Sequence, residues 1–82
     1  MKVLLYRDDE KSAHFKTQDG RLYYVHAHCD GTCAVVRVAK PYYWRKARFE
    51  NCQSVDEAIH RWFNGEEELV LSFLPLEESP II

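Results

Sequence analysis

The spacing of apolar and polar positions divides the chain into short strand-like segments followed by one helix. A brief apolar run at Lys2–Arg7 predicts a strand. Alternating or aromatic-rich segments then recur between turn residues, at Ser12–Thr17, Arg21–Cys29, Thr32–Lys40 and Tyr42–Phe49. Pro41 has no backbone N–H and is expected to end the ladder before the last of them. We therefore expect an antiparallel β-meander of about four strands.

Two Asp-Gly dipeptides connect the middle strands and predict their register. Asp19-Gly20 and Asp30-Gly31 favour two-residue type I′ hairpins, in which both central residues take positive φ. With such a turn, His28 lies opposite Cys33. One face of the sheet is then apolar without exception, and we expect the helix to cover it. It carries Tyr23, Val25, Ala27, Ala34, Val36 and Val38.

A helix is predicted after the meander, with both of its ends marked. Ser54 and Glu57 form a capping box, and Asn64-Gly65 supplies a stop signal. Between them lies one apolar stripe of Val55, Ala58, Ile59, Trp62 and Phe63. Leu69–Leu74 then predicts a final, fifth strand. The expected fold is α+β, with residues 1–76 as a single domain, the helix packed on one sheet face, and 77–82 as a loose C-terminal tail.

The second face of the predicted sheet is the main candidate for function. One short helix covers less than half of one face of such a sheet, so no element remains to cover this one. An exposed face that mixes aromatics, histidines and an arginine is typical of an interaction site. We expect a small non-enzymatic binding or adaptor protein that forms a homodimer or docks a protein partner here. The predicted contact residues are Phe15, Leu22, Tyr24, His26, His28, Val35 and Arg37.

Length and composition place the chain among small globular domains. It has 82 residues, of which 46% are hydrophobic and 13% aromatic, enough for one core. No segment reaches the ~18 apolar residues of a membrane span, so we expect no membrane contact. The N-terminal residues do not resemble a signal peptide. Three cysteines without a secretory segment indicate free thiols and a cytoplasmic protein.

Charge is unevenly distributed and raises a nucleic-acid alternative. Residues 1–49 hold ten Lys/Arg and five Asp/Glu, a net +5, whereas residues 50–82 hold one and eight, a net −7. The two halves either pair with each other or face different partners. Cations and aromatics on one antiparallel sheet suit single-stranded nucleic acid, although the pI of about 6.0 is low for such a domain. The candidate residues are Arg37, Lys40, Tyr42, Trp44, Arg45, Lys46 and Arg48.

A cluster of histidines and cysteines raises a metal alternative. His26 and His28 share one face of the predicted strand, and the expected turn adds Cys33, giving three ligands for zinc. Cys29 points to the opposite face, so the fourth ligand is missing. Zinc is the one cofactor that the sequence suggests. The pairing of Cys33 with His28 also resembles a thiol–imidazole couple, but without an identifiable oxyanion donor it does not predict an enzyme.

Overall fold

The computed structural model describes residues 1–39 and 41–71, which form one sheet and one helix. Helix α1 spans Val55–Trp62. Lys40, the side chain of Arg45, the far end of the predicted strand Leu69–Leu74 and the predicted tail 77–82 lie outside this description. The strands are β1 (Lys2–Arg7), β2 (Ser12–Lys16), β3 (Leu22–Ala27), β4 (Cys33–Ala39), β5 (Tyr42–Phe49) and β6 (Glu68–Leu71).

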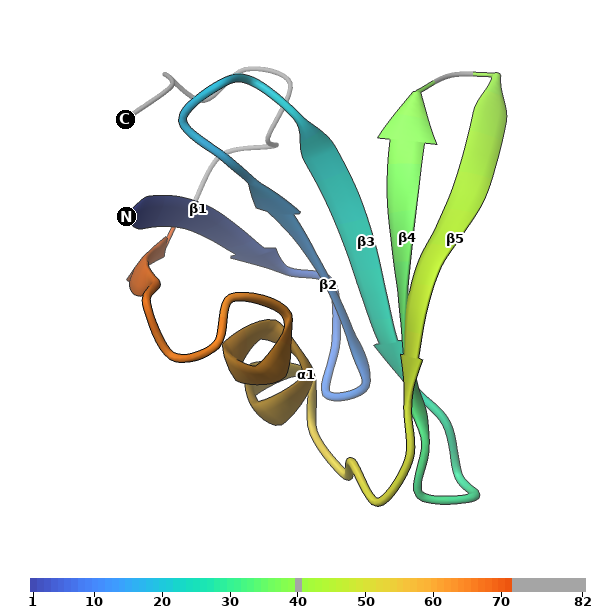
Figure 1. Cartoon of the computed structure of the whole chain (residues 1–82). Helices are drawn as coiled ribbons and strands as arrows, with labels where there is room; N and C mark the ends of the chain where they lie inside the picture. The colour runs from blue at the N-terminus through green and yellow to red at the C-terminus, as the bar shows by residue number, and fades with distance from the viewer. Residues whose placement is uncertain (40, 72–82) are drawn as a thin grey trace.

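The described strands form a single mixed sheet in the order β5-β4-β3-β2-β1-β6 (Figure 1). The α+β class is confirmed, but the expectation of about four meander strands and a purely antiparallel sheet is wrong. β1 to β5 form a five-stranded antiparallel meander, because Lys2–Arg7 joins the same sheet. β6 pairs with β1 in parallel, because α1 carries the chain from one edge of the sheet to the other.

Helix α1 begins and ends at the predicted signals. The Ser54 hydroxyl oxygen accepts a hydrogen bond of 3.1 Å from the backbone N–H of Glu57. At the other end, Asn64 and Gly65 take left-handed conformations with φ of 55° and 78°. The N–H of Gly65 donates to the carbonyl of His60 and so closes the last turn.

The two Asp-Gly loops are longer by one residue than predicted. Only the glycines take positive φ, 85° at Gly20 and 82° at Gly31, so the type I′ geometry does not form. Neither aspartate takes positive φ, and each accepts hydrogen bonds within its own loop. Asp30 Oδ1 accepts from the backbone N–H of Thr32 at 3.1 Å and from its hydroxyl at 2.7 Å. The loops are therefore three-residue turns ending in a left-handed glycine, a common alternative for hairpins.

The longer loops shift the register of both hairpins by one residue. Ala27, not His28, pairs with Cys33, and Phe15 pairs with Tyr23. The side chains of β4 consequently point to the opposite faces from those predicted. The face against α1, here called the inner face, carries Val3, Leu5, Ala13, Phe15, Tyr23, Val25, Ala27, Cys33, Val35 and Arg37. The outer face carries Leu4, Tyr6, His14, Leu22, Tyr24, His26, Ala34, Val36 and Val38.

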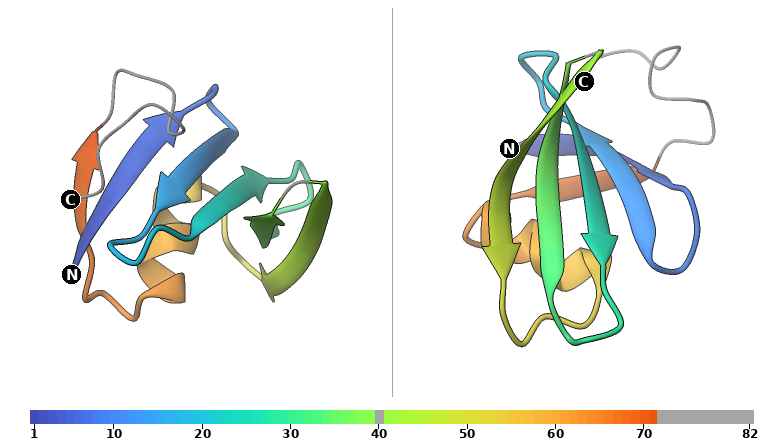
Figure 2. Two further views of the ribbon diagram at one scale, coloured as in Figure 1. Left: turned by 90° about the horizontal axis from the view of Figure 1, so that it is seen from above. Right: turned by 90° about the vertical axis from the view of Figure 1, so that its right-hand side faces the viewer.

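The prediction of a helix-covered face that includes Ala34, Val36 and Val38 is therefore wrong for these three residues. Cys33 and Val35 take their place in the core, both at 0% exposure. The sheet is strongly curved, and α1 lies in its hollow while β5 stands away from the helix (Figure 2). No helix among the described residues is long and apolar enough to cross a membrane.

Candidate functional site

The register shift divides the predicted interaction face between three environments. Phe15 and Val35 are fully buried in the core, each with 0% exposure. Arg37 lies on the inner face, next to Tyr23. The remaining predicted residues stay on the outer side of β3 and its loop, namely Leu22, Tyr24, His26 and His28. A single contact surface made of all seven residues therefore does not exist.

The predicted zinc set is separated as well. Cys33 lies on the inner face and its Sγ donates to the carbonyl of Cys52 at 3.1 Å. The rings of His26 and His28 meet on the outer side with their centroids 4.9 Å apart. Within residues 1–39 and 41–71, no three His, Cys, Asp or Glu side chains gather in a way that could hold a metal ion. The same separation removes the thiol–imidazole couple of Cys33 and His28.

The open half of the inner face carries a row of aromatic and cationic side chains. Tyr23, Arg37 and Trp44 are successive cross-strand partners on β3, β4 and β5. Tyr42 stacks on Trp44, with centroids 5.8 Å apart and planes at 26°. From the end of α1, Trp62 packs against Tyr23 at 5.6 Å. We call these five residues the aromatic trough.

Arg37 is the most informative member of the aromatic trough. Its guanidinium carbon lies 5.9 Å from the Tyr23 ring centroid, close enough for a cation–π contact. Its Nε is shielded from solvent and makes no hydrogen bond. Of the arginines whose side chains are described, Arg37 alone makes no ion pair. A half-buried charge without a counter-ion is costly, and an anionic ligand would supply the missing partner.

The edge strand β5 exposes its aromatics but does not align its cations as predicted. Tyr42 is 63% exposed and Trp44 49% exposed. A bulge opposite Val35 and Val36 inserts Lys46, so that Trp44 faces inward with Arg37. Arg48 instead pairs with Ala34 on the outer face. Trp44, Lys46 and Arg48 therefore do not share one face, contrary to the simple alternation of a regular strand.

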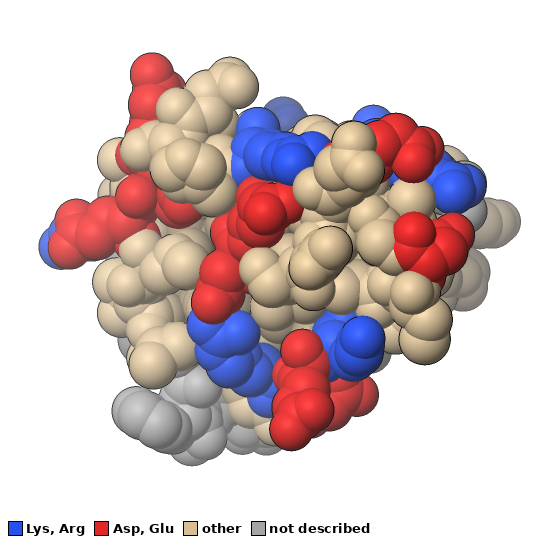
Figure 3. Space-filling model, turned by 90° about the horizontal axis from the view of Figure 1, so that it is seen from below, with Lys and Arg blue, Asp and Glu red and all other residues tan. Residues whose placement is uncertain are grey.

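The remaining charges are largely paired, mostly within each half of the sequence, and Arg7–Asp56 and Arg48–Glu50 join the two halves. Arg7 bonds Asp56 at 2.6 Å, and Arg48 lies 3.7 Å from Asp30 and 3.4 Å from Glu50. Seen from below, acidic and basic side chains interleave on the end of the molecule nearest the helix (Figure 3). The uneven charge of the sequence therefore becomes a mixed surface at this end.

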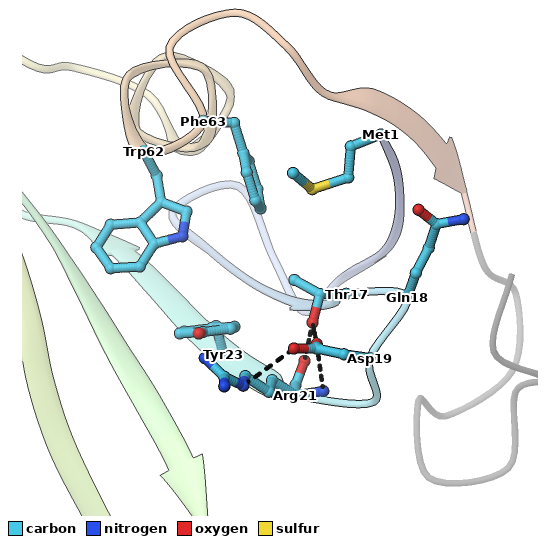
Figure 4. Close-up of a pocket in the computed structure, with 8 residues that line it drawn as sticks. All are labelled: Met1, Thr17, Gln18, Asp19, Arg21, Tyr23, Trp62 and Phe63. Atoms are coloured by element: carbon cyan, nitrogen blue, oxygen red, sulfur yellow. Dashed lines mark hydrogen bonds and ion pairs between the residues drawn. The ribbon is translucent and has the colours of Figure 1, made fainter.

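A cleft adjoins the aromatic trough at Tyr23. It lies between the end of α1, the β2–β3 loop and the N-terminal residue, and its volume is about 320 Å³. Trp62 and Phe63 point into it from the helix, opposite Tyr23 (Figure 4). At its rim the Thr17 hydroxyl donates to Asp19. The pKa of Asp19 is lowered by this bond above all, and in smaller part by Arg21, whose Nε lies 3.1 Å from the carboxylate.

The outer face carries a second row, made of histidine and tyrosine. His14 Nδ1 lies 2.7 Å from Asp8, and its ring is 5.0 Å from the Tyr24 ring. The Tyr24 hydroxyl lies 3.3 Å from His26 Nδ1. These groups bond to one another, whereas the polar groups of the aromatic trough lack partners within the described structure. The outer row is therefore largely satisfied without a ligand.

Two members of the aromatic trough escaped prediction from the sequence. Tyr23 was expected in the core, and Trp62 belonged to the apolar stripe of the helix. The core position of Tyr23 is confirmed at 6% exposure, and Trp62 is half-buried against the core, but neither was expected to border a binding surface. The available signal was that this stripe ends in two large aromatics, at the point where a short helix stops covering the sheet.

No family model matches this chain, and neither the curated proteins nor the solved structures contain a match.

Proposed function

We propose that this chain is a non-enzymatic binding protein that holds a single strand of nucleic acid along the aromatic trough. The observation that carries the proposal is the unpaired Arg37 guanidinium, stacked on Tyr23 and paired across the sheet with Trp44. Phosphate is the anion that arginine binds in nucleic acids, and bases stack on exposed aromatic rings. Trp44 and Tyr42 supply such rings beside the cation.

The net charge of −2 does not oppose the proposal as strongly as it first suggests. Away from the aromatic trough, the described arginines are neutralised by carboxylates, as Arg7 and Arg61 show. No acidic residue occurs between Arg37 and Arg48 in the sequence. The field felt by a ligand at the aromatic trough depends mainly on charges within a Debye length of ~8–10 Å, where Arg37 is unpaired within the described structure and the nearby Asp19 is paired with Arg21.

Pairing of β5 with a strand of another protein is a weaker explanation for its exposed aromatics. The bulge at Lys46 interrupts the edge, and Lys46 is itself exposed. Bulges and cations on an edge strand disfavour the addition of another strand. Two copies of β5 would also bring their cations together across the interface. The exposed rings therefore fit a ligand that stacks on them better than a strand that extends the sheet.

Binding of a labelled single-stranded oligodeoxynucleotide, followed by fluorescence anisotropy at low salt, tests the proposal. The Arg37→Met variant keeps the apolar stem and is expected to bind about tenfold more weakly. Arg48→Met is the matched control, because Arg48 already has carboxylate partners on the other face. We expect its affinity to change by less than ~threefold.

Two further ligands define what would contradict the proposal. If polyglutamate binds as tightly as the single-stranded oligodeoxynucleotide, the aromatic trough accepts any polyanion. If duplex DNA binds as tightly as the single strand, stacking of bases on the rings plays no part. Loss of affinity in Arg48→Met but not in Arg37→Met would place the ligand elsewhere on the molecule.

Self-association through the outer face is a second candidate, supported by one observation. The outer face carries apolar side chains with no helix over them, among them Leu22, Tyr24 and Val36. An uncovered apolar sheet face is often completed by a second copy. Sedimentation of wild type and Tyr24→Lys tests it: we expect a dimer that the substitution dissociates, and a wild-type monomer at ~100 μM would exclude it.

A further inference from the structure

We propose that the cleft beside Tyr23 takes one nucleobase of the bound strand, so that the aromatic trough ends in a base-recognition pocket. The inference rests on the proposed function, which names the polymer but not where an individual base is recognised. It assigns a role to the cleft lined by Trp62, Phe63 and Met1, which the stacking of bases on β5 does not use.

The shape and lining of the cleft match a flat, partly apolar ring. Its volume of about 320 Å³ lies at the lower end for ligand pockets, which favours a small occupant. Trp62 and Phe63 present aromatic rings from the helix, and Tyr23, whose ring already packs against Phe15, Trp62 and Arg37, lines the opposite side (Figure 4). A nucleobase has two faces that stack on such rings and an edge that hydrogen-bonds. An aliphatic chain would fill the apolar walls but would make no hydrogen bond to the Trp62 indole nitrogen or the Tyr23 hydroxyl.

Two of the residues that line the cleft carry hydrogen-bonding groups without a protein partner among the described residues. The Trp62 indole nitrogen and the Tyr23 hydroxyl make no hydrogen bond within the described structure, and both residues line the cleft. Asp19 lies at the rim and is held by Thr17 and Arg21 in a fixed position (Figure 4). The hydrogen bond from the Thr17 hydroxyl lowers the pKa of the Asp19 carboxyl further, and the carboxylate, charged at neutral pH, can accept a hydrogen bond from the amino group of a base.

The cleft and the phosphate site share one side chain. Trp62 and the Arg37 guanidinium carbon lie 5.6 Å and 5.9 Å from the same Tyr23 ring centroid. A base against Trp62 and a phosphate against Arg37 would therefore belong to the same or to adjacent nucleotides. The strand would then continue over Trp44 and Tyr42, where the rings are open to solvent.

The two tryptophans allow each end of this path to be observed separately. The chain has Trp44 and Trp62 and no others. The Trp44→Phe variant leaves Trp62 as the reporter of the cleft, and Trp62→Phe leaves Trp44 as the reporter of the open ring surface. Each substitution retains an aromatic ring, so the fold is expected to be preserved, which circular dichroism checks.

The experiment titrates Trp44→Phe with a single-stranded oligodeoxynucleotide and with an abasic sugar–phosphate oligomer of the same length. We expect the oligodeoxynucleotide to quench Trp62 emission, and the midpoint of this quenching curve should equal the midpoint of the anisotropy curve. The abasic oligomer should bind about tenfold or more weakly and leave Trp62 emission unchanged.

The outcomes separate this inference from the function on which it rests. If the oligodeoxynucleotide binds and quenches Trp44 in Trp62→Phe, but Trp62 emission in Trp44→Phe stays constant, no base enters the cleft. In that case the inference is wrong and the proposed function stands. If anisotropy detects no binding to wild type, the proposed function fails and the inference fails with it.

Discussion

The inner face of the sheet has two halves that differ in cover, composition and charge. Beneath α1, strands β3 and β4 carry Val25, Ala27 and Val35, none of which is more than 2% exposed. One step further along the same strands come Tyr23 and Arg37, and then the exposed ring of Trp44 on β5. The same face thus changes from small aliphatic residues to large aromatics and a cation where the helix ends.

This contrast separates residues that hold the fold from residues that the fold displays. Burial of apolar area explains the covered half, at roughly 25 cal/mol per Å². It does not explain the open half, where Tyr42 and Trp44 remain 63% and 49% exposed. Large exposed rings beside an unpaired arginine add little to stability, and the proposed ligand would give them a physical purpose.

The two halves of the inner face should differ most in how much stability is lost when an aromatic ring is removed. Phe15 is fully buried, stacks on Tyr23 at 5.0 Å and meets Phe63 edge-on at 5.6 Å. Phe15→Ala should lower the free energy of unfolding by about 3–5 kcal/mol, whereas Tyr42→Ala should change it by less than ~0.5 kcal/mol. Urea denaturation at neutral pH measures both. Similar losses in the two variants would break the distinction between the halves.

The thiols under the covered half predict a loss of stability at high pH. Burial above all, together with the neighbouring Cys33 thiol, raises the pKa of the Cys52 thiol from 9.0 to about 12. The folded chain therefore keeps a proton that the unfolded chain releases. The resulting stability is fully present below pH 9 and is lost as the pH rises from 9 to about 12.

Denaturation of wild type and Cys52→Ala across this pH range measures the effect. Other side chains also lose protons at high pH, so the prediction concerns the difference between the two proteins. The free energy of unfolding of Cys52→Ala should fall less steeply with pH than that of wild type. Alkylation at pH 8 gives an independent check, because Cys29 is exposed while Cys33 and Cys52 are buried. Native protein should take up one label and unfolded protein three. If the stability of both proteins falls equally with pH and the native protein takes up three alkyl labels, the two thiols are not buried as described.

A smaller effect compares two positions on the same strand and the same face. Val35→Thr places a hydroxyl in the covered half and should cost about 1–3 kcal/mol of unfolding free energy. Arg37→Met removes a charge whose Nε lacks a partner and should leave stability unchanged or raise it by up to ~1 kcal/mol. Thermal denaturation ranks the two variants. A large loss in Arg37→Met would mean that Arg37 supports the fold and needs no ligand.

The sequence predicted the elements well and the register poorly, for identifiable reasons. The Ser54 cap and the Asn64-Gly65 stop depend on local side-chain and backbone preferences, which sequence carries directly. The choice between a two-residue and a three-residue hairpin depends on whether aspartate adopts positive φ. Here Asp30 avoids positive φ and accepts two hydrogen bonds from Thr32 in the longer loop.

Three of the five residues of the aromatic trough followed from the sequence and two did not. Arg37, Tyr42 and Trp44 were predicted because cations and aromatics cluster there along the chain. Their common face was not predictable, because it depends on the bulge at Lys46 as well as on the hairpin register. The contribution of Trp62 depends on where the helix ends relative to the sheet, a tertiary property that no local pattern encodes.

The difference between the covered and the open half of the inner face is tested most directly by NMR. Amide chemical shifts of the ¹⁵N-labelled protein are mapped during titration with a single-stranded oligodeoxynucleotide. The account predicts that the shifts concentrate on Tyr23, Arg37, Tyr42–Trp44 and Trp62, with a separate change in the Arg37 Nε–H signal as it gains a phosphate partner. Backbone signals of Val25, Val35 and the other residues under α1 should stay in place. Shifts confined to the outer-face residues Tyr24 and His26, or none at saturating oligonucleotide, would contradict the claim that the open half of the inner face binds the ligand.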